Sequence, residues 1–159
     1  MKLAGVDIVD TEAVAAMLRR DRAEWEALVA VLEAHPEQRL HGEGSPSWVS
    51  RDVYAHLARG IWHSTDDLEA RLAGRTLPPL GGTDDEINAR WQQEDSGLSL
   101  AEARRRAQEA FERRLRAIES VRPRRWDPVL EAIANADGAE HYANHRRYIA
   151  VPQKEGGRP

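Results

Sequence analysis

The chain has 159 residues, a net charge of −4 and no cysteine. Its length suits one domain, and 41% hydrophobic with 31% charged residues is typical of a soluble protein. The weak negative charge offers no general attraction for nucleic acid or an anionic membrane. Without cysteine, disulfides, thiolate metal sites and thiol nucleophiles are excluded. The start of the chain lacks the apolar core of a signal peptide, so we expect a cytoplasmic protein.

Apolar residues at helical spacing predict a first helix over residues 11–34, for which Asp10 or Thr11 can act as the cap. A turn-rich loop follows this helix. After the loop, Ser50 is placed to cap a second helix, which Gly74 should end. We therefore expect two long amphipathic helices in the first half of the chain.

Two further helices are predicted by capping patterns. Thr83 and Glu86 have the spacing of a capping box, which should open a short helix that closes at Gly97. Ser99 repeats this chemistry and should start a long helix that reaches no further than Pro123. The long helix carries many arginines interleaved with glutamates, and we interpret them as a solvated face with helical ion pairs rather than a nucleic-acid surface: Arg104, Arg105, Arg106, Arg113, Arg114 and Arg116.

The end of the chain is predicted to form a brief helical turn and then a short last helix. Asp127 followed by Pro128 is typical of a cap with proline at the first helical position. The last helix should open at Asp137 and stop before Pro152. A helix of this length is marginal alone in water, so its side chains must be held by packing against the rest of the protein.

These elements predict an all-α protein, because no segment shows the alternating pattern of a strand. Four substantial helices with short connections favour a four-helix bundle, with a short inserted helix between the second and third long helices. The loops do not fix its topology. We expect one domain over residues 1–152 and a flexible tail over residues 153–159.

Three histidines form a candidate metal site. His141 and His145 are four residues apart and should share one face of the last helix, and His56 could supply a third ligand. Three protein ligands leave an open position for water or substrate. The same histidines could instead be hydrogen-bonding wall residues or a partly exposed pair. His63 lies about 10 Å further along the helix, too far to share the ion. Gly60 leaves space either for a ligand or for close helix packing.

Several motifs resemble the DinB/YfiT-like superfamily of four-helix bundle metalloenzymes, and the resemblance is closest to its DfsB/ClbS-like branch. The segment SWVSRDVYAHL over residues 47–57 is similar to the second-helix signature of that superfamily. Residues 84–90, 98–102 and 141–145 follow in the order that the branch would show. The resemblance implies an up-down-down-up bundle in which His56, His141 and His145 hold a divalent metal such as zinc or nickel.

We therefore expect a metal-dependent enzyme that acts on a small organic molecule by hydrolysis, isomerisation or thiol transfer. Because the chain has no cysteine, any sulfur nucleophile must be an external low-molecular-weight thiol. The alternatives are a metal-independent bundle that binds or sequesters a reactive small molecule for self-protection, and a module that pairs two subunits as a homodimer. Four residues are candidates for lining the substrate pocket, without an assigned catalytic role: Tyr54, Asn88, Trp91 and Tyr148.

Overall fold

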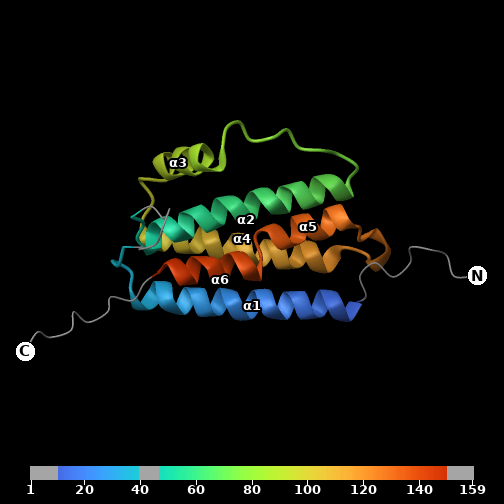
Figure 1. The fold of residues 1–159 in the computed structure, drawn as a ribbon, viewed down its shortest axis with the longest axis horizontal. Helices are drawn as coiled ribbons and strands as arrows, with labels where there is room; N and C mark the ends of the chain where they lie inside the picture. The colour runs from blue at the N-terminus through green and yellow to red at the C-terminus, as the bar shows by residue number, and fades with distance from the viewer. Residues whose placement is uncertain (1–10, 40–46, 150–159) are drawn as a thin grey trace, which may run out of the picture.

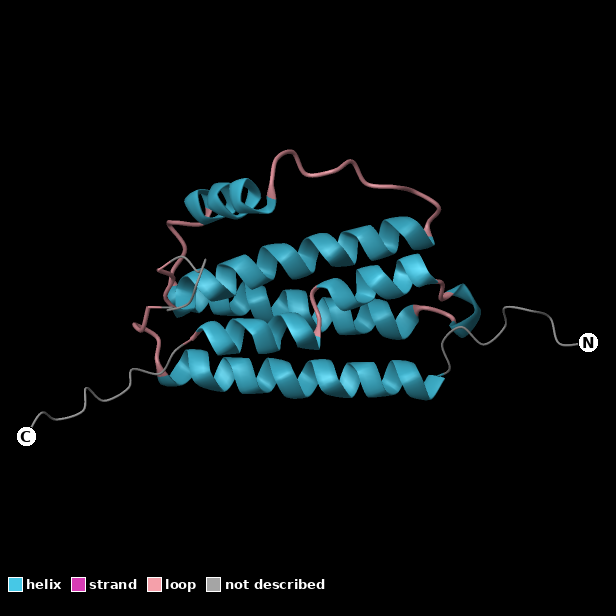
Figure 2. Ribbon diagram, viewed as in Figure 1, coloured by secondary structure: helices cyan, strands magenta, loops and turns pink. Residues whose placement is uncertain are grey.

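A computed structural model describes residues 11–39 and 47–149 of the chain. Every regular element in these ranges is helical, as Figure 2 shows, which confirms the predicted all-α class. No helix in the described parts is both long and apolar enough to cross a membrane. The elements in chain order are α1 (Thr11–Ala34), α2 (Ser50–Leu72), α3 (Asp84–Glu94), α4 (Leu100–Ser120), a 3₁₀ turn (Pro123–Arg125), α5 (Pro128–Ala136) and α6 (Ala139–Tyr148).

The long helices form an up-down-down-up bundle (Figure 1). Helix α2 runs opposite to α1, α4 runs in the same direction as α2, and the chain then returns through α5 and α6. The fourth position of the bundle is therefore shared by two consecutive short helices. Helix α3 lies outside the bundle, next to α2, as the predicted inserted helix. The predicted architecture is confirmed.

The most extensive packing joins α2 to α4 and α1 to α6. The main core lies between these two helix pairs and includes three aromatic side chains in direct contact. The Trp25 ring stacks on Phe111 with centroids 4.5 Å apart, and the edge of Tyr142 meets Trp25 at 5.2 Å. Because Tyr142 is fully buried, it holds α6 against the core and places the two histidines that flank it in the chain.

Most of the predicted helix starts are confirmed. Thr83 Oγ1 accepts a hydrogen bond from the Glu86 N–H at 3.2 Å, and the Glu86 carboxylate accepts from the Thr83 N–H at 3.0 Å. Ser99 and Asp127 likewise accept from backbone N–H groups three residues ahead. Such bonds satisfy N–H groups that have no partner within the helix. The predicted cap at Asp10 and the tail over residues 153–159 lie outside the described residues.

The predicted cap at Ser50 is wrong. Ser50 is the first residue of α2, and its hydroxyl donates 2.9 Å to the carbonyl oxygen of Leu32 in α1. The Asp52 carboxylate instead accepts a hydrogen bond from the Val49 N–H at 3.1 Å. Ser50 therefore ties the start of α2 to the end of α1, an interaction that the local sequence pattern does not indicate.

The arginine face of α4 also differs at one position. Arg114 is buried, contrary to its predicted place on a solvated face, and pairs with the equally buried Asp21 of α1 at 2.5 Å. Arg114 also donates to the carbonyl of Ala134, and Asp21 accepts from the Ala139 N–H at 2.8 Å. This pair therefore joins the end of α5 to the start of α6. A side chain on Gly138, between the two helices, would meet both charged groups within 3 Å.

Candidate metal centre

Helices α2 and α6 bring the three predicted histidines together. The Nε2 atoms of His141 and His145 lie 2.9 Å apart, because residues four apart in a helix point the same way. One ligand atom from each of His56, His141 and His145 can be chosen so that all three lie within 4.8 Å of one another. All three side chains are half-buried. The cluster is therefore partly accessible to solvent and partly enclosed by the bundle.

The surroundings keep these imidazoles neutral. The pKa of His56 is lowered to about 4, mainly by burial and then by the nearby His141, against the opposing charge of Asp137. Burial also lowers the pKa of His141, against the opposing charge of Asp137. The pKa of His145 is lowered strongly, first by burial and then by the two other histidines. Since neutral imidazoles have a free ring nitrogen, the cluster can offer lone pairs to a cation at pH 7.

The donor set fits a divalent transition metal. Two nitrogens that each lie about 2.0–2.1 Å from one zinc ion can be at most about 4.2 Å apart, and the His141–His145 separation of 2.9 Å satisfies this limit. The 4.8 Å that encloses all three ligand atoms is slightly wider, so binding by the full set requires a small inward shift of the side chains. The Nδ1 atoms of His56 and His145 are buried and lack a hydrogen-bond partner within the described ranges. Buried polar atoms are normally satisfied, so this centre has bonding capacity that an ion and its bound water can use. Imidazole suits zinc and nickel.

Three neighbours of the cluster complete the candidate centre. The Trp48 ring packs against His56 with centroids 4.9 Å apart. The Asp137 carboxylate lies 3.9 Å from Nδ1 of His141, one helical turn earlier in the chain. A Cβ on Gly60 would lie 3.1 Å from Oδ1 of Asp137. The space at Gly60 is thus filled by a carboxylate beside the histidines, an arrangement that neither interpretation of this glycine included.

The four residues predicted to contact the substrate do not line one common pocket in the structure. Asn88 and Trp91 of α3 lie around a cavity of about 10 Å³ that also borders His56. A cavity of this volume can hold at most about one water molecule. Tyr54 points toward α1, where its hydroxyl donates 2.7 Å to Glu33, and Tyr148 is 42% exposed at the end of α6. Asn88 and Trp91 therefore border one small cavity together with a histidine of the cluster.

Comparisons with known proteins establish the fold and no more. No protein-family model and no curated protein matches the sequence. Among solved structures, an uncharacterised protein from Escherichia coli UTI89 is similar, with a TM-score of 0.69 at 14% identity. The match covers 87% of this chain and 96% of the other. At this identity the likeness supports the helical architecture, and the function must be argued from the site.

Proposed function

We propose that the chain is a metal-dependent enzyme acting on a small organic molecule, with His56, His141 and His145 as ligands of zinc or nickel. The observation that carries this proposal is the convergence of three imidazoles from two helices, with their ligand atoms within 4.8 Å. Three protein ligands leave a coordination position free, which is the pattern of catalytic rather than structural zinc sites. The motif resemblance supports membership of the DinB/YfiT-like superfamily, closest to the DfsB/ClbS-like branch.

Each neighbouring residue has a proposed part in this centre. Asp137 orients the ring of His141, as carboxylates commonly do for ligating histidines. Trp48 covers one side of His56 and excludes water there. Asn88 and Trp91 are the proposed substrate contacts nearest the cluster, whereas contacts through Tyr54 and Tyr148 remain predictions without a shared cavity.

The reaction type follows from what such an ion supplies and what the chain lacks. A divalent ion at this site supplies Lewis acidity, which lowers the pKa of a water or thiol bound to it. The chain has no cysteine, so thiol transfer needs an external low-molecular-weight thiol as second substrate. Hydrolysis or isomerisation of a small electrophile needs no such partner. All three reactions use the same histidine cluster.

Elemental analysis tests the proposal directly. Untagged protein is loaded with zinc or nickel, freed of unbound metal and analysed by mass spectrometry for metal per chain. We expect stoichiometric metal in the wild type and none in His145→Ala. His63→Ala is the matched control, because it removes a histidine of α2 that lies outside the cluster and should retain the metal. Unchanged metal in His145→Ala contradicts the three-histidine site, and a metal-free wild type favours the metal-independent binding protein.

A further inference from the structure

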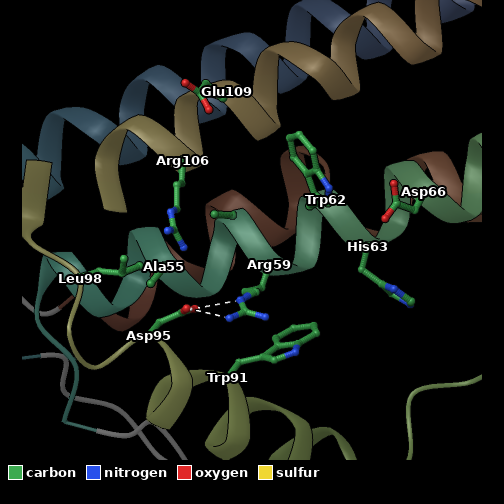
Figure 3. Close-up of a pocket in the computed structure, with 11 residues that line it drawn as sticks. Ala55, Arg59, Trp62, His63, Asp66, Trp91, Asp95, Leu98, Arg106 and Glu109 are labelled. Atoms are coloured by element: carbon green, nitrogen blue, oxygen red, sulfur yellow. Dashed lines mark hydrogen bonds and ion pairs between the residues drawn. The ribbon is translucent and has the colours of Figure 1, made fainter. Parts of the chain in front are cut away.

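A second cavity lies between α2, α3 and α4, away from the histidine cluster. Its volume is about 360 Å³, which falls in the range of small-molecule sites. Figure 3 shows residues from all three helices around it, with Trp62 on α2, Trp91 on α3 and Arg106 on α4. The narrow cavity beside His56 shares Ala55, Trp91 and Asp95 with it but has a volume of only about 10 Å³. A ligand here therefore has no open passage to the histidines.

The shape of this cavity is held by interactions of its walls. Arg59 binds Asp95 through two hydrogen bonds of 3.0 and 2.8 Å, which fixes the end of α3 against α2 (Figure 3). Arg113 lies 4.4 Å from the ring centre of Trp62 and holds it in place, although Trp62 is 46% exposed. A large exposed indole at the edge of a preformed hollow is typical of an aromatic binding site.

The charges of the walls favour an anion. Each of the three acidic residues in the lining already has a basic partner: Asp95 pairs with Arg59, Asp66 with Arg113 and Glu109 with Arg105. Arg106, in contrast, makes no ion pair or hydrogen bond with residues 11–39 or 47–149, and Figure 3 shows its side chain extending from α4 toward α2. A guanidinium without a partner can bind a carboxylate through two parallel hydrogen bonds. A cationic ligand would find no free acidic group here.

We propose that this cavity binds a small planar aromatic carboxylate, with the ring against Trp62 and Trp91 and the carboxylate on Arg106. Indole rings bury flat aromatic ligands well, and Ala55, Ala58 and Leu98 add apolar wall. No histidine of the cluster lines this cavity, so the site is distinct from the proposed metal ligands, although Trp91 also borders the narrow cavity beside His56.

The test uses chelator-treated protein and 2-naphthoate as the probe. The control ligand is 2-naphthalenemethanol, an uncharged analogue with the same ring system. We expect saturable 2-naphthoate binding by calorimetry, with NMR shifts at the indole N–H signals of Trp62 and Trp91. Those signals are assigned with single tryptophan-to-phenylalanine variants. Arg106→Gln should weaken 2-naphthoate by roughly tenfold, because a charge-assisted contact is lost, and leave 2-naphthalenemethanol within about twofold.

Arg116→Gln is the matched control, because it removes an exposed arginine of the same helix outside the cavity and should leave both affinities unchanged. Equal weakening by the Arg106 and Arg116 variants overturns the proposal, as does the absence of saturable 2-naphthoate binding. Loss of binding in His56→Ala places the carboxylate at the histidine cluster and also overturns it. Because the protein is free of metal in this assay, failure of the metal proposal would leave the expected result unchanged.

Discussion

Gly60 lies one helical turn after His56 and leaves room for a carboxylate from the junction between α5 and α6. The Asp137 carboxylate occupies this space and stays within 3.9 Å of the His141 ring. A methyl group at Gly60 would approach that carboxylate to 3.1 Å, closer than most real contacts of a Cβ. Any shift of Asp137 away from the methyl group changes its distance to His141.

We expect Gly60→Ala to weaken zinc binding by about tenfold, the lower end of the usual effect of losing such a carboxylate partner. Folding stability should hold or rise, because alanine is about 1 kcal/mol better than glycine within a helix. Competition with a chromophoric chelator measures the affinity, and urea unfolding measures the stability. Gly97→Ala is the control, since nothing lies within 4 Å of its new methyl group. Wild-type zinc affinity in both Gly60→Ala and Asp137→Asn would show that Asp137 does not support His141.

Glu33 of α1 receives hydrogen bonds from two other helices. Arg104 of α4 donates to it at 2.9 Å, and Tyr54 of α2 donates at 2.7 Å. The Arg104 hydrogen bond lowers the pKa of Glu33 below its usual 4.5, although burial acts in the opposite direction. The unfolded chain therefore takes up this proton at a higher pH than the folded chain, and the stabilisation is lost as the pH falls through the lowered pKa.

We expect Glu33→Gln to lower the melting temperature by at most a few degrees at pH 7, because the carboxylate is partly exposed and screened. The difference from wild type should shrink as the pH falls below 4.5, where the unfolded wild-type chain takes up the proton, and disappear below the lowered pKa of the folded protein, where the carboxylate is neutral in both states. Melting curves at a series of pH values check this. A difference that stays constant down to pH 3 would mean that the charge of Glu33 does not contribute.

The histidines were predictable from sequence, whereas their supporting residues were not. The four-residue spacing of His141 and His145 fixes their relation once a helix is assumed. Asp137 lies just before α6, and its contact depends on how α5 and α6 are placed against Gly60 of α2. That placement is tertiary, so helical periodicity carries no signal for it. Trp48 belongs to the segment over residues 47–57 that resembles the superfamily signature, but the sequence does not indicate its contact with His56.

At the scale of helices, the break between α5 and α6 depends on a buried ion pair. Arg114 bonds to the last turn of α5, and Asp21 accepts from the first residue of α6. The two side chains are 3% and 2% exposed. Gly138 allows this approach, because a Cβ there would lie 2.8 Å from Arg114 and 2.9 Å from Asp21. The pair therefore sets where α6 begins, two residues before His141.

We expect Arg114→Met to reduce the free energy of unfolding by about 3–5 kcal/mol, because it leaves Asp21 buried without its partner. The double variant with Asp21→Leu should recover part of this loss. The remaining deficit is about 1 kcal/mol for the lost hydrogen bond to the start of α6. Urea unfolding measures all variants. Arg105→Met, in an exposed pair on the same helix, should change stability by no more than about 0.5 kcal/mol. Equal effects of the Arg114 and Arg105 variants would contradict the assigned role of the buried pair.

The order of the helices was predicted from the sequence more accurately than which residues of each helix are buried and which partners they bind. Capping patterns at Thr83 and Ser99 are local chemistry and correctly marked two helix starts. Arg114, in contrast, lies among exposed arginines and glutamates, and its burial depends on Asp21 at a distance of 93 positions in the chain. Ser50 was misassigned for the same reason, since its hydroxyl bonds to α1 rather than to its own helix. Both errors came from partners that local spacing cannot show.

At the scale of the whole molecule, the histidine cluster lies where the two helix pairs of the bundle meet. Helix α2 packs most extensively on α4, and α6 packs most extensively on α1. His56 belongs to the first pair, and His141 and His145 belong to the second. An ion held by all three side chains would join the two pairs across the core. Metal binding should therefore stabilise the entire fold rather than one helix.

We expect zinc to raise the free energy of unfolding by about 2.7 kcal/mol when its free concentration is a hundred times the dissociation constant. The reason is mass action, because the unfolded chain does not hold the three histidines together. Urea unfolding with and without zinc measures the increase, and hydrogen exchange should show slower opening of α6. His63→Ala should be stabilised like the wild type, since His63 lies outside the cluster. His56→Ala should lose most of the increase, because α2 then contributes no ligand. Full stabilisation of His56→Ala by zinc would place the ion on α6 alone and remove the link between the two halves of the bundle.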